Sequence, residues 1–127
     1  MKTAGKSATK VALLPSARTE VIAADWGTLT WYASAKLGNS QHTTVGKCVI
    51  RPGLANPRHC HPNCEEVLVV LEGKIEHEIE GGRHVIMRDG DTITIPQGLL
   101  HNARNIGADD AVLLVVFSSA RREVKGE

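Results

Sequence analysis

Aromatic residues are scarce in this 127-residue sequence, which has two Trp, one Tyr and one Phe, and long hydrophobic runs are absent. The longest apolar segments cover residues 67–71 and 111–117, whereas a membrane-spanning helix needs roughly 20 apolar residues. Fifteen basic residues nearly balance fourteen acidic ones, for a formal net charge of +1, and no basic block is interleaved with aromatic residues. Nucleic acid and membrane are therefore not expected as partners.

Cysteine is also scarce, and the three present cannot all pair within one chain. Near the N-terminus, Lys10 is followed by only four apolar residues before Pro15, which is too short for the apolar core of a signal peptide. These two absences predict reduced thiols and a cytoplasmic location.

Short runs rich in β-branched residues make up most of the chain, and they are separated by turn sequences such as Pro-Gly, Gly-Gly and Asp-Gly. No stretch of ten or more residues keeps the 3.6-residue apolar period of a helix. The runs predict strands at residues 29–34, 43–50, 58–61, 66–72, 74–80, 83–87, 91–95, 100–105 and 111–118. This pattern predicts an all-β fold, a jelly roll or small barrel with an enclosed interior and little or no helix.

The predicted strands fall within one domain, residues 25–120. Outside it, residues 1–24 are interpreted as an N-terminal arm and residues 121–127 as a charged C-terminal tail. The arm contains two short apolar runs, Val11–Leu14 and Val21–Ala24, that could pair as strands with a second copy of the chain. Because natural proteins pair or cover exposed sheet edges, we expect a homodimer.

Four residues of metal-ligand type, His59, His61, Glu66 and His101, gather in two places. His59 and His61 are two residues apart in a predicted strand, so both imidazoles project from one face. Glu66 begins the next strand, and His101 follows the turn at residues 96–98. Three imidazoles and a carboxylate suit one divalent first-row metal ion per chain, namely Fe, Mn, Ni, Zn or Cu. The alternative is that the histidines only fill a polar barrel interior.

Two multi-position motifs stand out: residues 53–73 read Gly-x5-His-x-His-x4-Glu-x6-Gly, and residues 90–105 read Gly-x5-Pro-x-Gly-x2-His-x3-Asn. They resemble the two motifs of the cupin superfamily, and in particular of its small single-domain members. The resemblance implies a cupin-type double-stranded β-helix, a jelly-roll β-barrel, with the three histidines and the glutamate around a metal. It also implies a dimer. It leaves the reaction open, because cupins include dioxygenases, isomerases, lyases, storage proteins and binding modules.

The choice between Glu65 and Glu66 follows from strand parity, because only one of two adjacent residues in a strand can face the interior. Glu66 shares its parity with the apolar residues Leu68 and Val70, and it stands where the resemblance puts the family glutamate. We therefore assign Glu66 to the metal and expect Glu65 to face outward.

The remaining candidates have less specific roles. Cys60 lies between the two motif histidines and must point the other way in a strand, so we interpret it, Cys48 and Cys64 as packing thiols. Asn105, the last residue of the second motif, is interpreted as a turn-stabilising residue. His77 lies on the inward face of its strand, and the adjacent Glu76 and Glu78 face outward. Two interpretations of His77 stay open: a hydrogen-bonded core residue, or a support for a metal ligand.

These observations favour a metal-dependent enzyme that acts on a small organic acid or another oxygen-rich metabolite held in the barrel cavity. An iron or copper ion would imply dioxygenase chemistry, and manganese, nickel or zinc would imply isomerase, lyase or hydrolytic chemistry. Glu66 would be a ligand or, if it dissociates, a proton acceptor. The alternative is a non-catalytic module that binds a small molecule or a metal.

Overall fold

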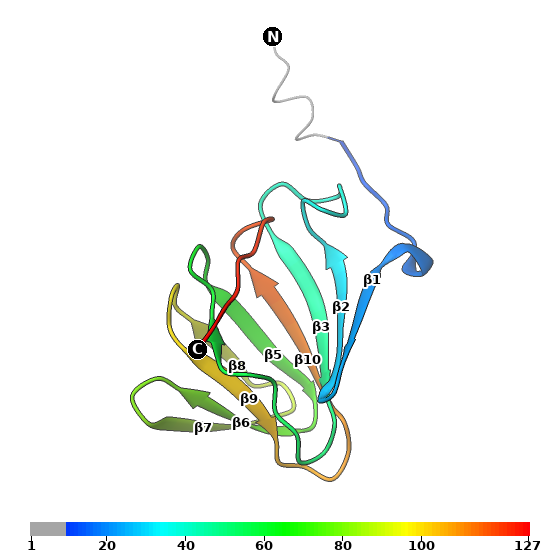
Figure 1. Cartoon of the computed structure of the whole chain (residues 1–127). Helices are drawn as coiled ribbons and strands as arrows, with labels where there is room; N and C mark the ends of the chain where they lie inside the picture. The colour runs from blue at the N-terminus through cyan, green and yellow to red at the C-terminus, as the bar shows by residue number, and fades with distance from the viewer. Residues whose placement is uncertain (1–9) are drawn as a thin grey trace.

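Two antiparallel sheets account for nearly all regular structure in residues 10–127, the part of the chain that the computed structural model describes (Figure 1). The first sheet has the strand order β1 (Glu20–Ala24), β2 (Gly27–Ala33), β3 (Thr44–Ile50), β10 (Ala111–Phe117), β5 (Glu66–Glu72), β8 (Thr92–Ile95). The second has the order β11 (Lys125–Gly126), β4 (His59–Cys60), β9 (His101–Asn105), β6 (Lys74–Ile79), β7 (Arg83–Arg88).

The predicted all-β jelly-roll fold is confirmed. All nine predicted strands are present, and the helical structure in residues 10–127 is one 3₁₀ turn, η1 (Ser16–Arg18). None of the helical structure in that range is long and apolar enough to cross a membrane. The crossed strand order, in which β10 lies between β3 and β5, brings a strand from late in the chain into the same sheet as β1, β2 and β3.

Alternation along the strands decides which side chains face the interior. On β6, Ile75, His77 and Ile79 are buried, whereas Glu76 and Glu78 are half-buried. Strand β10 is apolar throughout, and its side chains alternate between buried and half-buried. It therefore presents one face to the interior and packs the other less completely, as a central strand of a sandwich does.

The N-terminal arm differs from the prediction, because part of it belongs to the barrel. Residues 20–24 form β1, which pairs with β2 of the same chain and places Ala24 opposite Gly27. The turn at Asp25 and Trp26 folds the chain back at once, so the strand needs no partner copy. Residues 1–9 of the arm lie outside the described residues, and the exchange of a strand with a second copy stays a prediction, as does the homodimer.

The C-terminal tail, predicted to lie beyond the barrel, also packs onto it. We call residues 119–127 the strap. It runs from the end of β10 in the first sheet to β4 in the second (Figure 1). There Gly126 lies opposite His59, and the Glu127 carboxylate lies 3.1 Å from Nε of Arg58. β11 is a charged two-residue strand that forms by pairing with β4, which its own sequence does not indicate.

Gly46 leaves room for the ring of Trp31, which lies opposite it in the pairing of β2 with β3. A Cβ atom on Gly46 would lie 2.6 Å from Cζ3 of that ring, closer than atoms can approach. Gly126, by contrast, has open space around it.

We expect Gly46→Ala to lower the free energy of unfolding by about 1–3 kcal/mol, because the added methyl group overpacks the interior against Trp31. Gly126→Ala is the matched control and should cost much less. Urea unfolding followed by tryptophan fluorescence measures both. A wild-type midpoint for Gly46→Ala would contradict the described position of the Trp31 ring.

Candidate metal centre

The four predicted ligands come together between the two sheets. One potential ligand atom from each of His59, His61, Glu66 and His101 lies within 4.8 Å of the other three. Pairing of β4 with β9 sets His59 opposite His101 in the second sheet, while Glu66 begins β5 in the first. His61 directly follows β4. The cluster therefore forms only when both sheets close on each other.

Backbone carbonyls hold two of the imidazoles in one tautomer. His59 Nδ1 lies 2.7 Å from the Pro57 carbonyl oxygen, and His61 Nδ1 lies 2.9 Å from that of Glu123. A carbonyl oxygen only accepts, so Nδ1 carries the proton in each ring. The Nε2 lone pair is left bare, as a metal ligand requires.

Three buried hydrogen-bond acceptor atoms then face one another without a donor. Glu66 Oε1 lies 3.3 Å from His61 Nε2 and 3.2 Å from His101 Nε2, and all three atoms are buried and unsatisfied. Acceptors that face each other at this distance repel, and leaving them buried is costly. One cation among them would satisfy all three at once. The four residues therefore fit a divalent metal ion.

The surroundings shift the pKa values of the cluster toward the protonation states that bind a cation. Burial lowers the pKa of His101 to about 3, against the opposing effect of the Glu66 carboxylate. Burial also lowers the pKa of His59. Burial by itself would raise the pKa of Glu66, but the close contact with His61 and the electrostatic effect of His101, His61 and His59 outweigh burial and hold this pKa below its usual value. At neutral pH, His59 and His101 are therefore neutral and Glu66 is anionic.

His77 contacts the cluster directly. Its Nε2 lies 2.8 Å from Nδ1 of His101, and the two ring planes are only 6° apart. One proton lies between the two nitrogens. When it sits on His101, Nε2 of that ring is bare for a metal, and His77 accepts the hydrogen bond. Of the two interpretations left open, this contact favours support of a metal ligand.

A cavity of about 270 Å³ adjoins the cluster, and its lining includes three residues that the sequence analysis missed, Trp31, Phe117 and Arg122. The Phe117 ring lies 4.7 Å from the His61 ring, centroid to centroid. The Arg122 guanidinium lies 4.5 Å from the Trp31 ring centroid and 5.2 Å from that of Phe117. Strand parity could have found the two rings, but Arg122 lies in the strap and carries no periodic signal.

The other predicted side chains lie where expected. Cys48, Cys60 and Cys64 are free thiols outside the four-residue cluster, and burial raises the pKa of Cys48 to about 12. Asn105 stabilises turns, because its Nδ2 donates to the carbonyl oxygens of Ile50 and Asp109 at 2.7 and 2.8 Å.

The fold and the cluster define a double-stranded β-helix with a candidate metal centre in its interior. The chain belongs to the cupin family, because the family model of the cupin domain matches residues 46–117. This membership confirms the resemblance that the two sequence motifs indicated.

Curated relatives share the barrel region. Oxalate oxidase 1 of Hordeum vulgare is 31% identical over 112 residues, which cover 82% of this chain and 51% of that protein. Germin-like protein 3-3 of Oryza sativa subsp. japonica is 34% identical over 88 residues, which cover 64% of this chain and 39% of that protein. The chain thus spans about half, or less, of the length of these relatives.

Solved structures show the same fold. An oxalate decarboxylase of Bacillus subtilis superposes with a TM-score of 0.79 at 23% identity, covering 87% of this chain and 30% of that one. The formate complex of the Lactobacillus farciminis oxalate decarboxylase superposes with a TM-score of 0.79 at 21% identity, covering 85% of this chain and 33% of that one. At these identities the likeness shows the fold alone.

Glu66 and the exposed Glu65 form a matched pair for testing the cluster. We expect Glu66→Gln to weaken the binding of Zn²⁺ at pH 7 by about tenfold or more, because a neutral amide replaces the buried anion. Glu65→Gln should leave binding unchanged. Calorimetric titration of metal-free protein measures both. The opposite ranking would mean that β5 is shifted by one residue, which would exchange its two faces.

Proposed function

We propose that this chain is a metal-dependent enzyme that acts on a small oxygen-rich metabolite in the barrel cavity. One divalent first-row metal ion would be held by His59, His61, Glu66 and His101. One observation carries the proposal: Glu66 Oε1, His61 Nε2 and His101 Nε2 are buried acceptor atoms that lack any hydrogen-bond partner within the described residues. A purely structural barrel gives no reason to keep such an arrangement.

The bound ion would supply a Lewis acid or, as iron or copper, redox chemistry. The protein's part is to present the ligands without rearrangement. The carbonyls of Pro57 and Glu123 hold His59 and His61 by Nδ1, and His77 holds His101 in the same way. Such outer contacts fix the tautomer and the ring orientation of each ligand.

The relatives support the class of chemistry. The names of the similar curated proteins include oxalate oxidases, and the similar folds include oxalate decarboxylases, so enzymes that act on a small organic acid are represented in both. The Bacillus subtilis oxalate decarboxylase is described as having Mn(II) centres. Manganese is therefore one candidate for this chain, beside iron, nickel, zinc and copper.

A non-catalytic binding module is the second candidate. Among the residues that line the cavity, Glu66 is the one acidic side chain, and it belongs to the proposed ligand set. No separate carboxylate is therefore available there as a general base. This feature favours capture of a ligand without chemistry.

Metal content tests the proposal most directly. Protein made without a histidine tag should contain about one equivalent of a divalent first-row metal, and His61→Ala should contain almost none, because an imidazole donor is lost. His42→Ala is the control, since His42 is exposed and outside the cluster. Elemental analysis measures all three. Unchanged metal content in His61→Ala would refute the assignment.

A metabolite screen separates the two candidates. Metal-loaded protein is incubated with a panel of organic acids and oxygenated metabolites, and the mixtures are followed by NMR. Turnover that disappears in His61→Ala would support the enzyme. A compound that raises the melting temperature but is recovered unchanged would favour the binding module.

His77 is proposed to position His101 from behind. We expect His77→Leu to lower the affinity for Zn²⁺ by about 10–100-fold, because His101 loses its hydrogen-bond partner. His77→Gln, which offers a carbonyl oxygen as acceptor, should restore part of the loss. Zinc titration and thermal unfolding are measured on the same preparations. Unchanged affinity with raised stability in His77→Leu would make His77 a core residue only.

A further inference from the structure

The cavity beside the metal centre has an apolar wall. Its volume of about 270 Å³ is close to the lower end of the roughly 300–1,000 Å³ of small-molecule sites. The apolar lining consists of Trp26, Leu29, Trp31, Leu68, Ala103, Leu113, Val115, Phe117 and Val124. A dicarboxylate such as oxalate, which has no apolar body, would leave this surface without contacts. The wall fits a ligand that carries apolar carbon.

Arg122 is a cation at this cavity that makes no ion pair within residues 10–127. The other arginine in the lining, Arg58, is paired with Glu127. Cζ of the Arg122 guanidinium lies over the rings of Trp31 and Phe117, 4.5 and 5.2 Å from their centroids. Such cation–π contacts do not use the N–H groups as hydrogen-bond donors to an oxygen, so these groups stay available for an anion.

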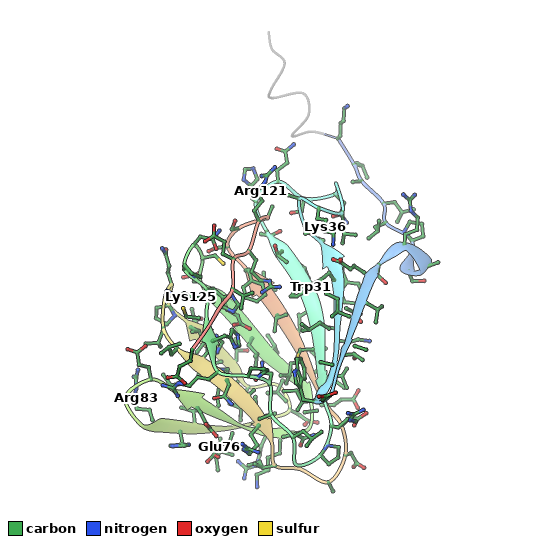
Figure 2. All side chains as sticks on the ribbon, viewed as in Figure 1. Trp31, Lys36, Glu76, Arg83, Arg121 and Lys125 are labelled. Carbon is green, nitrogen blue, oxygen red and sulfur yellow. The ribbon has the colours of Figure 1, made fainter. Side chains whose placement is uncertain are left out.

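The backbone around Arg122 is held in place on both sides. Asn63 Nδ2 donates to the carbonyl oxygen of Arg121, and the Glu123 amide donates to Asn63 Oδ1, each at 2.9 Å. Figure 2 labels Arg121 and Lys125 near the two ends of the strap, so the path of this segment can be followed there. The guanidinium is thus positioned before any ligand arrives, which lowers the entropic cost of binding.

The Arg122 guanidinium also lies near the metal centre. The ring centroid of Phe117 lies 5.2 Å from Cζ of Arg122 and 4.7 Å from the ring centroid of His61, so one aromatic ring is in contact with both side chains. A ligand in the cavity can therefore meet the apolar wall, the cation and the proposed metal together.

Building on the proposed function, we propose that the cavity binds an organic monocarboxylate with an apolar body and that Arg122 selects its carboxylate. A guanidinium matches a carboxylate with two parallel hydrogen bonds. Outside the metal centre, Arg122 is the one arginine of the lining without an ion pair, so that part of the cavity balances one negative charge. A ligand with a second charge at its far end would have to bury that charge against the apolar wall, which is costly.

Three probes test the ligand class on protein loaded with Zn²⁺. 3-Phenylpropanoate has both the charge and the body, 3-phenylpropanamide has the body without the charge, and acetate has the charge without the body. We expect 3-phenylpropanoate to bind at least about tenfold more tightly than either of the others by calorimetric titration. Equal affinity for the acid and its amide, or no binding of the acid at millimolar concentration, would overturn the proposal.

Variants of Arg122 test whether this residue selects the carboxylate. Arg122→Gln should reduce the affinity for 3-phenylpropanoate to that for the amide and leave the affinity for the amide within about twofold. Arg121→Gln is the control, because Arg121 is its exposed neighbour and is absent from the cavity lining. Arg122→Lys, which keeps the charge, should retain part of the preference for the acid. If Arg122→Gln does not fold, Arg122→Lys and the wild-type comparison decide the question. A preference for the acid that is unchanged in Arg122→Gln would remove this role.

Zinc content, measured on each preparation, separates this proposal from the proposed function. A wild-type chain that takes up no zinc would refute the metal centre. The same titrations on the metal-free protein would then decide the ligand class. A zinc-loaded chain that does not distinguish the acid from the amide would refute only the ligand class.

Discussion

The rest of the interior depends on one constraint, the close approach of the buried Glu66 carboxylate to two imidazole nitrogens that do not donate to it. Its Oε1 faces the Nε2 atoms of His61 and His101 at 3.3 and 3.2 Å, and neither contact is satisfied by a proton on the tautomers that the surroundings favour. Such an arrangement is stable only with a cation present or with strong support from the fold. That support comes from three directions: the Pro57 carbonyl behind His59, the Glu123 carbonyl behind His61, and His77 behind His101.

Strand register sets the apolar wall next to this polar cluster. Glu66 lies opposite Phe117, so the aromatic ring begins the inward row that contains the carboxylate. The next inward row places Leu68 opposite Val115, and Val115 opposite Gly46, whose missing side chain admits the Trp31 ring. A shift of one residue would reverse both rows together. The cavity is therefore polar at one end and apolar along its wall for the same geometric reason.

Sequence patterns were sufficient to predict the features that depend only on which side of a strand a residue faces. The alternation around Glu66 and the His-x-His spacing were enough to predict the candidate ligands that the structure brings together, and the turn residues marked the nine predicted strands. The contact of His77 with His101 was beyond prediction, because it depends on the register of β6 against β9, which sets Ile79 opposite His101. The partners of the two terminal strands could not be predicted: the run Val21–Ala24 indicates a strand but not that it pairs with β2 of the same chain, and β11 forms by pairing with the distant β4 rather than through its own composition.

The strap joins the two functional elements that we propose. The Glu123 carbonyl holds His61 in the tautomer that a metal needs, and the residue before it, Arg122, presents the cation of the proposed ligand site. Asn63, two residues after His61, holds the backbone on both sides of Arg122. The orientation of one proposed ligand and the position of the cation therefore depend on the same few hydrogen bonds. A displacement of the strap would disturb both, so a ligand that fixes Arg122 would also stabilise His61 in its metal-binding orientation.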